Sequence, residues 1–164
     1  ELYCPADKVV ELWKKVLEAG EEEGILPCGL GARDTLRMEA AMPLYGHEMD
    51  ETVSPRETGL GFAVKMDKDD FIGKAALEVA ATRKRIGLKV TGRGIIREHQ
   101  AVFVGDEEIG MTTSGTHCPF LGYPVAMALV KKESVEVGDS VVVEVRGRKV
   151  EAEVVALPFY KREK

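Results

Sequence analysis

The sequence has few of the residues that cross-link small folds or build metal centres. Only three of its 164 residues are cysteines, namely Cys4, Cys28 and Cys118. An odd number of cysteines, scattered along the chain, predicts neither a disulfide framework nor a zinc site. We therefore expect free thiols, small and either buried or at the surface, in a reducing compartment, and no metal.

Long apolar runs and an excess of positive charge are also missing. No run approaches the roughly 18 apolar residues of a transmembrane helix, and no signal segment opens the chain. Lysine and arginine number 23 against 28 aspartates and glutamates, which gives a net charge of −5 and a pI of about 5.4. This balance argues against electrostatic capture of nucleic acid. We expect neither a membrane nor a nucleic acid as a partner.

The common catalytic signatures are absent as well. The sequence contains no G-x-S-x-G, no Walker loop and no H-E-x-x-H. Its three histidines are widely spaced, and we expect each of them at the surface or in a loop. What the sequence does have is 45% hydrophobic residues and 17 glycines. This composition is typical of a folded chain with many turns and short strands.

The first half has the pattern of an α+β segment. Apolar residues at three- and four-residue spacing predict a helix over residues 5–23, ended by Gly20 or Gly24. A second helix is expected over 31–41, stopped by Pro43. Residues 43–59 look irregular, and a loop of that length is usually functional or disordered. A short strand over 60–65 and a helix over 74–83 complete this part.

From Arg85 onward the pattern changes to strand, turn, strand. Apolar or alternating runs predict strands over 86–90, 101–104, 107–113, 125–130, 140–146 and 149–156. The second and third form one hairpin, and the last two form another. We place a domain boundary near residue 83, with an antiparallel barrel or sandwich after it.

Two charged residues are candidates for ligand contacts. Arg33 lies at the start of the second expected helix, where the helix dipole disfavours positive charge. It either pairs with a nearby carboxylate or reaches an anion or a planar ligand. Glu1 is either solvated or accepts two parallel hydrogen bonds from a ring such as a pterin.

The residues around Arg33 closely resemble the aminomethyltransferases of the glycine cleavage system, the T-protein family. The resemblance runs in order along the whole chain and includes these motifs: GLGARDTLRME (29–39), PLYGHE (43–48), GLGFAV (59–64), DFIGK (70–74), GRGI (92–95), IGMTTSGT (109–116) and LPFY (157–160).

The resemblance implies an α+β fold that begins inside a domain. T proteins are more than twice as long and comprise two α+β domains and a β-barrel. Residues 1–83 would be the C-terminal part of the folate-binding domain, and residues 84–164 the antiparallel β-barrel domain. The chain starts abruptly at Glu1, so we expect a fragment that lacks the N-terminal half. The family's catalytic aspartate would lie in that half, and the fragment alone is expected to be inactive.

The resemblance also implies the reaction and part of the site. Family members take an aminomethyl group from the lipoyl arm of H protein and give methylene-tetrahydrofolate and ammonia. Tetrahydrofolate is the co-substrate, and H protein is the partner. Glu1 matches the glutamate that holds the pterin edge, and Arg33 matches the folate-contacting arginine. Arg162, in the C-terminal tail, is the third predicted folate contact.

Two alternatives remain open at this point. The chain could belong to another folate-dependent member of the superfamily, such as a tRNA-modification factor, a methyl-transferring demethylase or a dimethylglycine- or sarcosine-oxidising enzyme. It could instead be a non-catalytic module that binds the lipoyl carrier. The expected compartment is the cytoplasm, or the mitochondrial matrix in a eukaryote.

Overall fold

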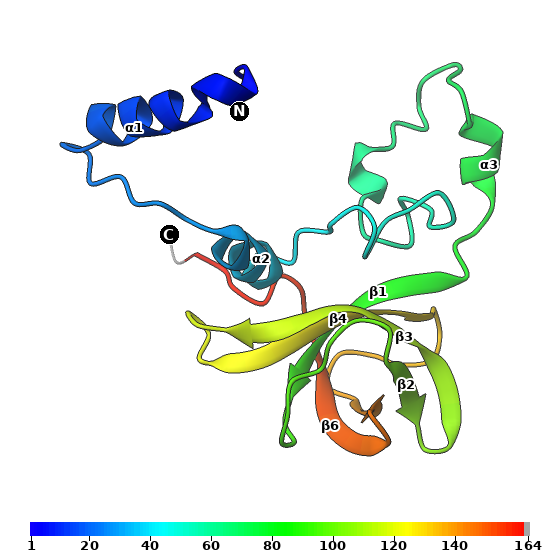
Figure 1. Cartoon of the computed structure of the whole chain (residues 1–164). Coiled ribbons are helices and arrows are strands. Elements are labelled where there is room, and N and C mark those ends of the chain that lie inside the picture. The colour runs from blue at the N-terminus through cyan, green and yellow to red at the C-terminus, as the bar shows by residue number, and fades with distance from the viewer. Residues whose placement is uncertain (163–164) are drawn as a thin grey trace. The chain divides into compact units, whose positions relative to one another are not determined.

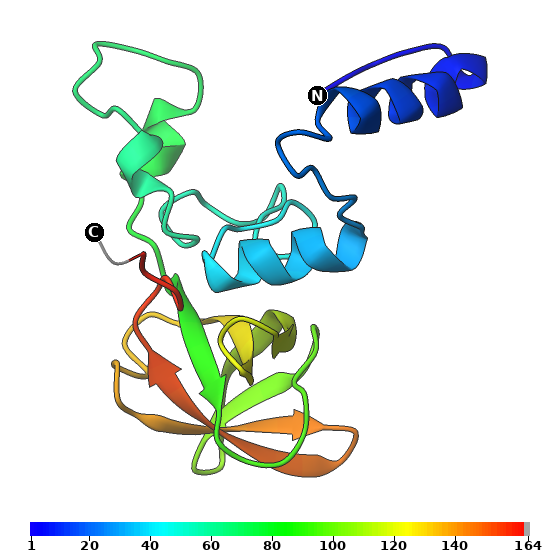
Figure 2. The same cartoon turned by 90° about the vertical axis from the view of Figure 1, so that its left-hand side faces the viewer.

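The computed structural model describes residues 1–162 as two compact units, the first being Glu1–Arg33 and the second beginning at Asp34. No helix in this part of the chain is long and apolar enough to cross a bilayer. The elements, coloured along the chain in Figures 1 and 2, are η1 (Ala6–Lys8), α1 (Val9–Ala19), α2 (Leu30–Glu39), η2 (Gly61–Ala63), α3 (Lys74–Glu78), β1 (Arg83–Val90), β2 (Ala101–Val104), β3 (Glu107–Cys118), β4 (Tyr123–Lys131), β5 (Ser140–Val145) and β6 (Arg148–Val155).

The first unit is built around the expected amphipathic helix. Pro5 precedes the 3-10 turn η1, and α1 follows directly from it. The helix ends at Gly20, whose backbone N–H donates to the carbonyl oxygens of Val16 and Glu18. The helix predicted over residues 5–23 is therefore confirmed, with Gly20 rather than Gly24 at its end.

The second unit contains a closed six-stranded antiparallel barrel. The strand order around it is β1-β4-β3-β2-β5-β6, and β1 closes it by pairing with β6 (Figure 2). The expected antiparallel architecture is confirmed, and closure selects the barrel over the sandwich. In the β5–β6 hairpin Arg146 and Gly147 have φ of 53° and 73°, as the type I′ turns of two-residue hairpins require.

The barrel core follows from period-two alternation along the strands. In β6, for example, Val150, Ala152 and Val154 are buried and alternate with more exposed residues. The inward-facing side chains form one apolar cluster that draws on all six strands. A second, smaller cluster lies outside it, where Met38 and Ala41 pack with Cys118, Val125 and Met127. The C-terminal end of α2 is thus held against β3 and β4.

Two predicted elements differ from the structure. The strand expected over residues 60–65 is wrong, since residues 61–63 form the 3-10 turn η2, with Ala63 N–H donating to Leu60 O. A strand needs an edge to pair with, and a closed barrel offers none. The helix expected over 74–83 ends at Glu78, because Arg83 is already paired with Lys131 as the first residue of β1.

Candidate functional site

The three predicted folate contacts lie in two separate units. Glu1 and Arg33 belong to the first unit and Arg162 to the second. All three side chains are exposed. Their roles in binding folate stay predictions.

Glu1 and Arg33 have different local surroundings. The Glu1 carboxylate accepts a hydrogen bond from the Tyr3 hydroxyl, and this bond raises the pKa of Tyr3. Arg33 is the fourth residue of α2, and its backbone N–H donates to Gly29 O at 3.1 Å. The ion pairs described within the first unit join Lys8 and Lys15 to Glu11 and leave Arg33 out.

Arg37, one helical turn after Arg33 in the sequence, is the centre of a polar network. Its Nε and Nη2 lie 2.8 and 2.7 Å from Asp34 Oδ1, and Nη2 also donates to Ser114 Oγ at 2.9 Å. Its Nη1 donates to Glu48 Oε2 at 2.9 Å. Only 11% of the Arg37 side chain is exposed.

Glu48 is the buried anion of this network. Its side chain is fully buried, and each carboxylate oxygen has a partner. Oε2 accepts from Arg37 and from the backbone N–H of Leu44 at 2.9 Å. Oε1 accepts from the Thr113 hydroxyl at 2.7 Å. Thr113 is the bulged residue of β3, where the register with β4 shifts, and the bulge presents its hydroxyl to the loop.

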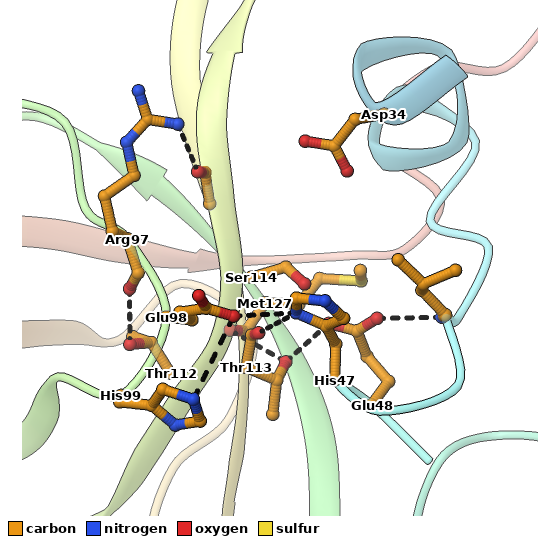
Figure 3. A network of polar contacts seen from close by, with 12 residues as sticks. Asp34, His47, Glu48, Arg97, Glu98, His99, Thr112, Thr113, Ser114 and Met127 are labelled. Atoms are coloured by element: carbon orange, nitrogen blue, oxygen red, sulfur yellow. Dashed lines mark hydrogen bonds and ion pairs between the residues drawn. The ribbon is translucent and has the colours of Figure 1, made fainter. Parts of the chain in front are cut away.

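His47 and Glu98 extend the network across the bulge. His47 Nδ1 lies 2.8 Å from Glu98 Oε2 and 3.3 Å from Thr113 O. Figure 3 shows His47 and Glu98 meeting beside Thr113, with Glu48 next to His47. Both side chains are partly exposed. The loop containing residues 44–48 is therefore joined to β3 by Glu48 and to the 91–100 connection by His47.

Further polar contacts hold the end of α2 on the barrel. Glu39, which is buried, accepts from Phe120 N–H at 3.1 Å, and its carbonyl accepts from Tyr160 N–H at 2.9 Å. Arg85 Nη1 donates to Ala41 O at 2.7 Å, and burial lowers the pKa of Arg85. Cys118 is buried in the smaller apolar cluster, and burial raises the pKa of its thiol to about 11. The thiol is therefore neutral at physiological pH and a poor nucleophile.

The polar network around Arg37 and Glu48 has a structural role. The charged groups of Arg37 and Glu48 are largely buried, and each is hydrogen-bonded to the other and to neighbouring groups. Within residues 1–162, no group of three histidine, cysteine, aspartate or glutamate side chains could hold a metal ion. The network fixes α2 and the 44–48 loop to the barrel.

Glu48 and Thr113 lie within two of the family motifs, but the sequence predicted no contact between them. Their side chains meet across 65 positions, and Arg37 and Ser114 across 77. A local sequence pattern cannot predict contacts between residues so far apart in the sequence.

Two models of one protein family match the chain. The "GCVT N-terminal domain" matches residues 1–68, and the "Glycine cleavage T-protein C-terminal barrel domain" matches residues 83–161. Together they cover most of the chain, and the second coincides with the six-stranded barrel. The domain boundary predicted near residue 83 stays a prediction.

Relatives of known name are similar over the full chain. An "Aminomethyltransferase" of Halalkalibacterium halodurans is 52% identical over 166 residues, which cover 99% of this chain and 46% of that protein. The "Aminomethyltransferase" of a Geobacillus species (strain WCH70) is 51% identical, and the match covers 100% of this chain and 46% of that protein. The chain thus spans about half the length of these relatives.

A solved structure shares the fold. The glycine cleavage system aminomethyltransferase T from Bartonella henselae matches with a TM-score of 0.83 and 33% sequence identity. The match covers 95% of this chain and 45% of that one.

Proposed function

Because the chain belongs to the glycine cleavage T-protein family, we propose that it supplies the barrel and part of the folate site of a tetrahydrofolate-dependent aminomethyltransferase. The observation that carries the proposal is the roughly 50% identity to aminomethyltransferases over the whole chain. The names of these relatives give no support to the alternatives of a tRNA-modification factor, an oxidising enzyme or a carrier-binding module.

The proposed reaction transfers one carbon between two carriers. The lipoyl arm of H protein delivers an aminomethyl group, tetrahydrofolate takes the carbon as its methylene form, and ammonia leaves. The arm is left as a dithiol. Such a transfer needs a slot that fixes the pterin ring while the arm enters from an open side. We further propose the cytoplasm, or the mitochondrial matrix in a eukaryote, as the compartment, on the resemblance alone.

Three residues of this chain are proposed to hold the folate. The Glu1 carboxylate suits the paired N–H donors of a pterin edge, because it can accept two parallel hydrogen bonds. The guanidinium groups of Arg33 and Arg162 suit the carboxylates of the folate glutamyl tail. All three side chains are exposed, which is consistent with groups that bind a ligand from outside. The catalytic acid or base is proposed to lie outside this chain.

Titration of tetrahydrofolate into the chain tests this assignment. Arg33→Ala is expected to raise the dissociation constant about tenfold or more, since a hydrogen bond to a charged group contributes roughly 1.5–3 kcal/mol. Arg93→Ala is the matched control, because Arg93 is also exposed and has no proposed role. Calorimetry provides the constants for the three proteins.

Equal weakening by Arg33→Ala and Arg93→Ala would contradict a specific contact at Arg33. Absence of any saturable heat with the unsubstituted chain would contradict the proposal that this chain by itself holds enough of the slot to bind folate. Membership of the family, which rests on the comparisons, would stand in either case.

A further inference from the structure

The bulge in β3 turns two consecutive side chains of the barrel toward one polar network. In a regular strand, consecutive side chains point to opposite faces of the sheet. Here the Thr113 hydroxyl donates to Glu48 Oε1 at 2.7 Å, and Ser114 Oγ accepts from Arg37 Nη2 at 2.9 Å (Figure 3). The register shift between Thr112 and Ser114 makes this possible. Bulges of this kind re-aim side chains and are frequent next to active sites.

The contacts run without a gap from the bulge to the residue beside Arg33. Arg37 Nη2 lies 2.7 Å from Asp34 Oδ1, and Asp34 follows Arg33 directly in α2. Residues four positions apart in a helix lie on the same side of it, so Arg33 is on the side of α2 that carries Arg37.

The second half of α2 is attached to the barrel at two points. Apolar packing provides one of them, where Met38 lies against Val125 and Met127. The buried residues of α2 are Met38 and Glu39, both at its C-terminal end. One point of attachment would leave a short helix free to turn about that point. The Arg37 contacts provide the second point, and two points together fix the direction and the rotation of the helix.

An arginine that binds a carboxylate depends on the orientation of its guanidinium group. The group presents a planar fork of donors, and its hydrogen bonds to a carboxylate are strongest when two form in parallel. A group that is already correctly placed before binding loses less freedom when the ligand arrives. The rotation of α2 about its axis therefore bears directly on how well Arg33 can bind.

We propose that Thr113 and Ser114 are positioning residues for the folate contact at Arg33. Through Glu48 and Arg37 they fix the rotation of α2, and with it the direction in which the Arg33 side chain leaves the helix. Neither hydroxyl needs to touch the ligand. The inference rests on the proposed function, because it takes Arg33 as a folate contact.

Two neighbouring threonines allow a matched test. Thr113→Val removes the hydroxyl that donates to Glu48 and keeps a β-branched side chain of similar shape. Thr112→Val is the control, because Thr112 is only 1% exposed and its hydroxyl donates to Arg97 O at 2.7 Å. That bond holds the 91–100 connection and not α2. Circular dichroism first establishes that both variants are folded at the temperature of the titration.

Calorimetric titration of tetrahydrofolate measures the effect on binding. Thr113→Val is expected to raise the dissociation constant about threefold, a modest coupling for groups in one network. A positioning residue cannot cost more than the contact it positions, so the effect must stay below that of Arg33→Ala. Thr112→Val is expected to bind like the unsubstituted chain. In the Arg33→Ala background, Thr113→Val is expected to add nothing, whereas a residue with a general structural role would still add its own effect.

Hydrogen exchange measures the same coupling without folate. Amides in a segment that opens locally exchange faster, even when the protein as a whole stays folded. We expect Thr113→Val to accelerate the exchange of the α2 amides, including that of Arg33, whose N–H donates to Gly29 O. Thr112→Val is expected to leave their exchange unchanged. Ser114→Ala removes the acceptor for Arg37 and should act in the same direction as Thr113→Val.

Three outcomes would overturn the proposal. They are equal weakening of folate binding by Thr113→Val and Thr112→Val, an undiminished effect of Thr113→Val in the Arg33→Ala background, and equal exchange of the α2 amides in the two threonine variants. A different result would count against the proposed function. If the unsubstituted chain gave no saturable heat while Thr113→Val alone accelerated α2 exchange, the folate site on this chain would be refuted and the link between Thr113 and α2 would be supported.

Discussion

Replacing Glu48 with glutamine is expected to lower the free energy of unfolding of the barrel-containing unit by about 3 kcal/mol. Removing one partner of a buried ion pair leaves the other charge uncompensated, at a cost of roughly 3–5 kcal/mol. The Glu48 side chain is fully buried and only 11% of the Arg37 side chain is exposed. Asp34 remains next to Arg37 at 2.7 Å, which places the expected value at the lower end of this range. Urea unfolding followed by circular dichroism measures it.

Glu107→Gln is the matched control for this prediction. Glu107 likewise forms an ion pair, with Lys131 at 2.6 Å, but both side chains are mostly exposed. Exposed pairs are screened by water and salt, so no measurable change in unfolding free energy is expected. Joint replacement of Arg37 by methionine and Glu48 by leucine should recover part of the loss, because it removes both buried charges. Equal effects of Glu48→Gln and Glu107→Gln would show that the polar network does not stabilise the unit.

Gly110→Ala is expected to destabilise the barrel by about 3 kcal/mol, at the upper end of typical overpacking costs. A Cβ at this position would lie 2.2 Å from Leu129 O and 2.6 Å from Val130 Cα. Both atoms belong to the backbone of β4, which pairs with β3 at this point. The ladder between the two strands would have to open, since no flexible side chain can move aside. Thermal and urea unfolding of the variant measure the loss.

The same substitution at Gly61 isolates the effect of the close strand contact. A Cβ there would meet Arg56 Cγ at 3.9 Å, an ordinary van der Waals distance. We expect Gly61→Ala to leave the free energy of unfolding nearly unchanged. If Gly110→Ala were as stable as Gly61→Ala, the registry of β3 with β4 described above would be incorrect.

Much of the fold was predictable because its signals are local. Turn residues and period-two alternation located the hairpins β2–β3 and β5–β6, and the apolar spacing located α1. The strand predicted over 60–65 failed for a reason that no local pattern contains. A strand exists only where a neighbouring edge is available, and here the barrel is closed by β1 and β6.

The polar network of Arg37, Glu48 and Thr113 could not be predicted from the sequence, for a similar reason. The loop 43–59 was expected to be irregular, and it is, but no local pattern in it marks Glu48 as a buried residue. Glu48 is buried because the bulge at Thr113, 65 positions away, offers it a hydroxyl. The predicted folate contacts Glu1, Arg33 and Arg162 came from the family resemblance, and their roles stay predictions.

The most direct test of the account is a single-turnover assay of one-carbon transfer. Aminomethylated H protein and tetrahydrofolate are mixed with this chain in complex with the unmatched N-terminal portion of a relative, and methylene-tetrahydrofolate is measured. The account predicts product only when both polypeptides are present, and a loss of at least tenfold with Arg33→Ala but none with Arg93→Ala. A folded complex that binds tetrahydrofolate yet forms no methylene-tetrahydrofolate would contradict it.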